Sequence, residues 1–187
     1  MNLKNYFSYK SMNFVTFGLV LILWYICFNL INTLSDGFMK ISIFFLLFSM
    51  IIMLFLLLVN KFGFIFLFYI AIVILGVEIP GFEAYKASFY LPVINGFLFE
   101  IMFLLLYMLF NSEIKSKLFT VAIMNFLLLS MITLFTAAEL FAIKLFEIFN
   151  LSFIIFIISL AGGLIAVFLW YHVRTSKYIL DYEYKND

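Results

Sequence analysis

The chain has 187 residues, of which 67% are hydrophobic and only 11% are charged, and its formal net charge is +1. Soluble domains average about 45–50% apolar and about 25% charged residues. A chain this short leaves much of its surface exposed, so the composition excludes a water-soluble globule and gives no concentrated basic face for nucleic acid. We therefore expect the lipid bilayer to be its main partner.

Six apolar runs follow one another along the chain, each close to the ~20 residues that cross about 30 Å of hydrocarbon. They cover residues 12–31, 41–59, 62–79, 90–110, 118–138 and 151–171. Backbone groups in lipid must be satisfied within the segment, which requires helices, and the runs lack the alternation of a membrane barrel. The first run is longer than a signal-peptide core and has no small-residue cleavage site, so we expect it to be retained.

The sequence therefore predicts an all-α polytopic membrane protein with a single six-helix domain over residues 1–187 and a polar tail at 172–187. Asn60-Lys61 predicts a tight turn that joins the second and third spans as a hairpin. Residues 111–117 predict a short loop, so the fourth and fifth spans should be antiparallel neighbours. The charged segment 139–149 fits either the end of the fifth span or a helix in the membrane interface.

Lysine and arginine are distributed unequally between the two sides that six spans define. One side, which holds both termini, receives Lys4, Lys10, Lys61, Lys115, Lys117, Arg174, Lys177 and Lys185, and the other receives Lys40, Lys86 and Lys144. Cytoplasmic loops are enriched in these residues. We therefore expect both termini in the cytoplasm of a bacterial or archaeal cell and the protein in its cytoplasmic membrane.

The fourth span carries one carboxylate, Glu100, near its middle. A charge at the bilayer centre costs at least ~2.5–3.5 kcal/mol on insertion scales, so Glu100 should face protein or be protonated. Pro92, Gly96 and Glu100 are four residues apart and define an inward face. The fifth span offers polar side chains at matching depth, with Glu100 level with the stretch between Asn125 and Ser130.

These residues predict a ligand or ion site formed by Glu100, Asn95, Tyr107, Asn125, Ser130 and Thr133. The alternative is structural: a protonated Glu100 that ties two helices together. The acids Glu78, Glu83 and Glu139 gather at the expected outer mouth, where they could bind a cation or a head group, or form an ordinary solvated loop. Ser159, Gly162, Gly163 and Ala166 predict a packing face of small residues, within the protein or toward a partner subunit.

Motifs for catalysis and cofactor binding are missing from the sequence. It contains no P-loop, no H-E-x-x-H and no G-x-S-x-G. The single histidine, His172, has no second His or Cys near it, so we expect no metal site and no cofactor. A nucleotide-binding motif is also missing, so any energy coupling must come from another protein.

Three functional hypotheses remain after these exclusions. The first is a non-enzymatic membrane subunit, of a transport system, that binds a small molecule or ion near Glu100 and works with a partner membrane protein. The second is an accessory or immunity-type protein that acts by helix contact with another membrane protein. The third is an intramembrane enzyme on a lipid or isoprenoid substrate that uses the outer acids.

Overall fold

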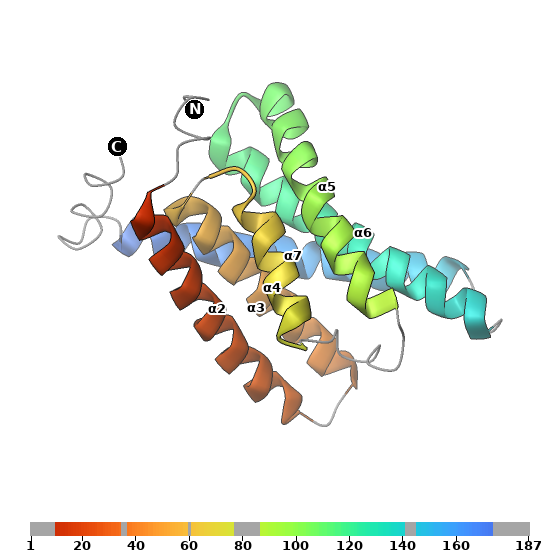
Figure 1. Ribbon diagram of the computed structural model, residues 1–187. Coiled ribbons are helices and arrows are strands. Elements are labelled where there is room, and N and C mark those ends of the chain that lie inside the picture. The colour runs from red at the N-terminus through yellow and green to blue at the C-terminus, as the bar shows by residue number, and fades with distance from the viewer. Residues whose placement is uncertain (1–9, 35–36, 60, 77–86, 141–144, 174–187) are drawn as a thin grey trace.

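The computed structural model describes residues 10–34, 37–59, 61–76, 87–140 and 145–173. All regular structure in these ranges is helical, which confirms the predicted all-α membrane fold (Figure 1). The helices are α2 (Ser11–Asn32), α3 (Gly37–Leu58), α4 (Phe64–Ile74), α5 (Ala87–Phe110), α6 (Glu113–Leu140) and α7 (Leu145–Val173).

Five of the helices are long and apolar enough to cross a membrane, and α4 is the exception. α4 has only 11 residues, about 16 Å at the helical rise, whereas hydrocarbon is about 30 Å thick. The third predicted span, 62–79, therefore contains a much shorter helix than we expected. Residues 77–86, which follow it, lie outside the described part of the chain.

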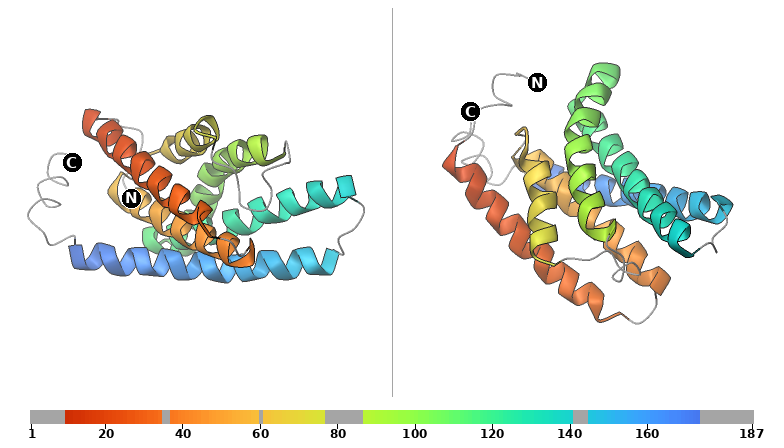
Figure 2. Two further views of the ribbon diagram at one scale, coloured as in Figure 1. Left: turned by 90° about the horizontal axis from the view of Figure 1, so that it is seen from below. Right: turned by 45° about the vertical axis from the view of Figure 1, so that its right-hand side comes forward.

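The bundle is organised around α3, which contacts α2, α6 and α7. α4 lies against α5 and α2, while α5, α6 and α7 follow one another as successive neighbours. The left view of Figure 2 shows α7 along one side of the molecule, and the right view shows the α5–α6 turn projecting beyond the end of the α3–α4 pair. The α3–α4 turn is thus set back along the length of α5.

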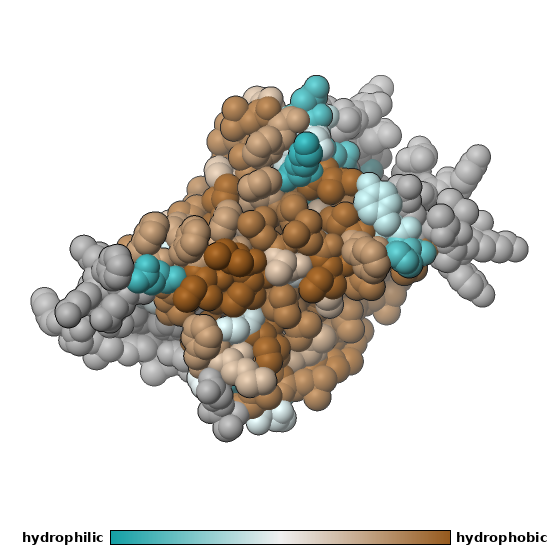
Figure 3. Space-filling view, turned by 180° about the vertical axis from the view of Figure 1, so that it is seen from behind, coloured by the Kyte–Doolittle hydropathy of each residue, from teal (hydrophilic) through white to brown (hydrophobic). Residues whose placement is uncertain are grey.

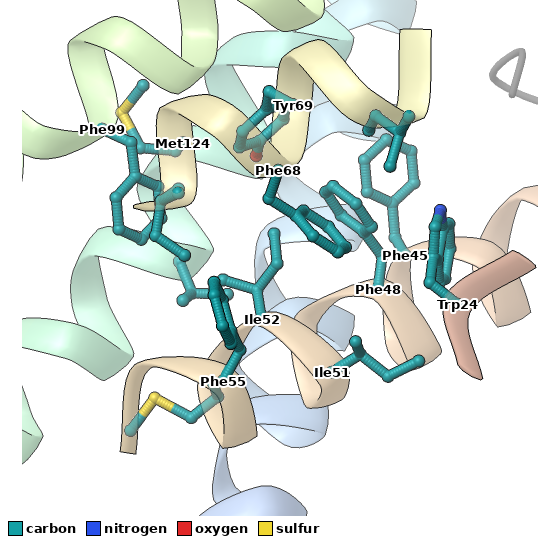
Figure 4. Close-up of a cluster of buried hydrophobic side chains, with 14 of the residues drawn as sticks. Trp24, Phe45, Phe48, Ile51, Ile52, Phe55, Phe68, Tyr69, Phe99 and Met124 are labelled. Carbon is teal, nitrogen blue, oxygen red and sulfur yellow. The ribbon is translucent and has the colours of Figure 1, made fainter. Parts of the chain in front are cut away.

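Aromatic side chains fill the space between α2, α3 and α4 (Figure 4). The ring of Trp24 lies 5.0 Å from that of Phe48, and Phe48 meets the ring of Tyr69 edge-on at 5.6 Å. Edge-to-face contacts at such distances stabilise packing beyond the area they bury. On the outside, Figure 3 shows apolar side chains over most of the face seen from behind, as expected of a surface in lipid.

Candidate functional site

The Glu100 side chain contacts the turn between α3 and α4. It is 4% exposed, and its Oε1 accepts a hydrogen bond of 2.9 Å from the backbone N–H of Gly63. Gly63 is the residue immediately before α4 and has a left-handed conformation with a φ of 79°, which glycine adopts without strain. The first N–H groups of a helix lack partners within it, and a carboxylate there also complements the helix dipole. Glu100 therefore caps the N-terminus of α4.

This partner differs from the one that the sequence suggested. Within the part of the chain that the structure describes, neither Asn125 nor Ser130 bonds to Glu100. Asn125 instead donates from Nδ2 to the hydroxyls of Ser49 at 2.8 Å and Ser159 at 3.1 Å. The reason is that Asn125 faces α3 and α7, whereas Glu100 faces the start of α4.

Lys117 is a second buried charge at the same turn, although the sequence predicts it in a loop. The structure begins α6 at Glu113, so Lys117 lies in a helix, where it is 2% exposed. Its Nζ donates to the carbonyl of Leu56, in the last turn of α3, at 2.8 Å and to Oε1 of Glu113 at 2.6 Å. The spacing of Glu113 and Lys117, four residues apart, is the signal that could have placed both on one helix face.

Asn95 lies in the interface between α4 and α5. Its Nδ2 donates to the Tyr69 hydroxyl at 3.1 Å, and both side chains are buried. Gly96 allows this close approach, because a Cβ at that position would stand 2.8 Å from atoms of Tyr69. The Asn95 Oδ1 has no hydrogen-bond partner among the described residues. Nothing in the sequence marked Tyr69, a single tyrosine in an apolar run.

The four small residues of α7 that the sequence predicted as a packing face all lie inside the bundle. Ser159 and Ala166 are fully buried, and Ser159 receives the hydrogen bond from Asn125. A Cβ on Gly162 would stand 2.5 Å from the carbonyl oxygen of Leu46 in α3, and one on Gly163 would stand 2.5 Å from Leu118 Cδ1 in α6. In this structure these glycines bring α7 close to α3 and α6.

The other predicted site residues are not brought together with Glu100 by any described contact. Thr133 donates to the carbonyl of Leu129 within its own helix, and Tyr107 is half-buried with its ring 6.3 Å from that of Phe103. Glu139 lies in the last turn of α6, which runs on to Leu140, but its side chain is outside the described part. The two other outer acids, Glu78 and Glu83, fall in the segment that is not described.

The α3–α4 turn gathers charged side chains around two helix ends. Three buried charged side chains, Lys61, Glu100 and Lys117, lie at or against the α3–α4 turn. Across the described ranges, no three His, Cys, Asp or Glu residues lie close enough to hold a metal ion. A separate, open surface pocket of about 310 Å³ between α6 and α7 has an apolar lining, formed by Ile123, Phe126, Leu127, Phe149, Phe153 and Phe156.

Comparisons of the chain with protein-family models, with curated proteins and with solved structures gave no match.

Proposed function

We propose that this integral membrane protein is a non-enzymatic subunit of a transport system, and that it binds a small molecule or ion beside Glu100, at the N-terminus of α4. The observation that carries the proposal is a half-length helix that begins against a buried carboxylate in the middle of a membrane span.

The depth of this helix start follows from the length of α5. Its apolar part, Tyr90–Phe110, is a candidate span, and Glu100 is ten residues from either end, or about 15 Å from each membrane surface. Beyond Glu100, Leu105 is 50% and Met108 78% exposed. Large apolar patches are unfavourable in water, so this half of α5 belongs in lipid and the α4 N-terminus near the bilayer centre.

A helix that starts at the bilayer centre is an arrangement with a known use. Non-helical backbone at that depth is tolerated where it is buried in protein or lines a cavity. In many secondary transporters, half-helices with such ends form the binding site at the midplane, and their N-termini attract anionic groups. This chain resembles those transporters only in the arrangement of its short helix. The buried Glu100, Lys61 and Lys117 support the proposal further, because ionisable groups inside a membrane often mark ion and substrate pathways.

The first alternative, a protein acting only by helix contact, would be expected to offer its small residues to a partner, but Gly162 and Gly163 face α3 and α6. The second, an enzyme on lipid substrates, would rely on the acids Glu78, Glu83 and Glu139, whose side chains lie outside the described residues.

We further propose that both termini lie in the cytoplasm. Lys61 and Lys117 are buried in the bundle and do not count as loop charges. The remaining lysine and arginine residues still favour the side with both termini: Lys4, Lys10, Lys115, Arg174, Lys177 and Lys185 against Lys40, Lys86 and Lys144.

The test is ligand binding by the purified full-length protein. Thermal unfolding is measured with a panel of amino acids, vitamins and monovalent cations, and equilibrium dialysis then gives the affinity for each stabilising compound. We expect Glu100→Gln to weaken binding at least about tenfold, the effect of losing roughly 1.4 kcal/mol. Met108→Leu, an exposed change on the same helix, should bind normally. A panel without any stabilising compound, or equal binding by Glu100→Gln, contradicts the proposal.

A further inference from the structure

We propose that Lys117 and Glu100 are positioning residues that together hold the break between α3 and α4 inside the bundle. Lys117 holds the end of α3 through the Leu56 carbonyl, and Glu100 holds the start of α4 through the Gly63 N–H. The inference goes beyond the proposed function, because it applies whether or not the turn binds a solute.

The sign of each charge matches the helix end that it contacts. A helix C-terminus carries partial negative charge and an N-terminus partial positive charge. The ammonium of Lys117 therefore complements α3, and the carboxylate of Glu100 complements α4. Glu113 also pairs with Lys117 at 2.6 Å, which orients the ammonium toward α3.

Glu100 and Lys117 come from neighbouring helices with a short connection. Glu100 is on α5 and Lys117 on α6, and only residues 111 and 112 separate these helices. Asn111, with a φ of 47°, reverses the chain direction there. The α5–α6 hairpin thus contacts both sides of the break between α3 and α4, through Lys117 on one side and Glu100 on the other. Figure 1 shows the α3–α4 turn beside α5.

Burial makes both contacts necessary. A backbone C=O or N–H left without a partner in a water-free interior is strongly unfavourable, and water is the only substitute partner. Lys117 and Glu100 are 2% and 4% exposed, so water reaches the freed groups only if the turn moves. Removing one charged side chain should therefore open the turn to water and leave the rest of the bundle packed.

Water access to the turn can be measured by thiol labelling of the full-length protein in proteoliposomes. Cys27, the only cysteine, is replaced by serine, and Phe62→Cys places a reporter in the turn. We expect Lys117→Met to raise the rate of N-ethylmaleimide labelling about tenfold or more, since hydrogen bonds to charged groups shift local equilibria on that scale. Lys117→Arg should restore most of the protection, and Lys115→Met, an exposed lysine on the same helix, should change nothing.

A second reporter separates opening of the turn from general loosening. Ser152→Cys replaces a fully buried serine on α7, and its labelling rate should stay the same in Lys117→Met. Equal rates at the turn in Lys117→Met and wild type, or an equal rise at both reporters, overturns the proposal. If Lys117→Met does not fold, Glu113→Gln decides in its place: a smaller rise at the turn alone supports the proposal, and no rise overturns it. The assay needs no ligand, so its failure is distinct from failure of the proposed transport function.

Discussion

The contact between α7 and α3 gives a prediction with a built-in comparison, because two adjacent glycines face different kinds of neighbour. The Cβ added by Gly162→Ala would stand 2.5 Å from the Leu46 carbonyl oxygen and 3.2 Å from Ser49 Cβ. Carbon–oxygen contacts between backbones are normally about 3.3–3.6 Å. The Leu46 oxygen belongs to a helix backbone and cannot rotate away, so α7 must move about 1 Å from α3.

The cost follows from the loss of packing along that seam. A gap of about 0.5–1 Å removes roughly a quarter to a half of each dispersion contact across it, and forced overpacking typically costs about 1–3 kcal/mol. The Cβ of Gly163→Ala would instead meet Leu118 Cδ1, the end of a side chain that can change rotamer. We expect Gly162→Ala to lose about 1–3 kcal/mol and Gly163→Ala clearly less.

The purified variants are heated in detergent, and size-exclusion chromatography measures how much protein remains monodisperse at each temperature. This gives an unfolding midpoint for each variant. Gly18→Ala is the control, because a Cβ there meets no atom within 4 Å and alanine favours a helix over glycine by up to about 1 kcal/mol. The expected order of midpoints is Gly18→Ala at or above wild type, then Gly163→Ala, then Gly162→Ala. A midpoint for Gly163→Ala at or below that of Gly162→Ala refutes the reasoning.

Three further predictions follow from the hydrogen bonds and the charge distribution. Asn125→Leu removes the bonds to Ser49 and Ser159 and should lower stability by about 1–2 kcal/mol, as membrane hydrogen bonds average roughly 0.6 kcal/mol each; an unchanged unfolding midpoint would contradict the role of this bridge. Tyr69→Phe leaves the Asn95 amide without its described acceptor, so it should cost about 1–3 kcal/mol, whereas an exposed Tyr→Phe change, Tyr90→Phe, should cost almost nothing in the same assay. A fluorescent protein fused to either terminus should fluoresce, and alkaline phosphatase fused to either terminus should be inactive, because both ends are expected in the cytoplasm. Phosphatase activity at one end would show that the predicted orientation is wrong.

The sequence by itself determined the class of the protein and the position of its long helices. Insertion into lipid depends on the summed hydrophobicity of about 20 consecutive residues, and that is a local property. Each predicted long span lies within or within one residue of its observed helix, as 12–31 does in Ser11–Asn32. The observed helices extend further mainly where polar residues such as Glu113 join the first turn.

The partner of Glu100 could not be obtained in the same way. The apolar helices of this chain have hydrophobic residues on all sides, so the sequence does not indicate which face meets which neighbour. The sequence suggested Asn125 as the partner of Glu100 only because the two residues lie at a similar depth in the membrane. Every helix of the bundle has residues at that depth, so depth cannot identify the partner. The position of the α3–α4 turn beside α5 decides the contact, because it brings the backbone N–H of Gly63 to the Glu100 carboxylate.

Tertiary structure also decided what the buried charges do. From the sequence, Glu100 lacked a second ionisable group, and Lys117 was counted with a loop. Packing brings both to the break between α3 and α4, where Glu100 bonds to the Gly63 N–H and Lys117 to the Leu56 carbonyl. Hydropathy places an apolar segment in the membrane, but only the packing of α5 and α6 against the α3–α4 pair shows which backbone groups these two charges bind.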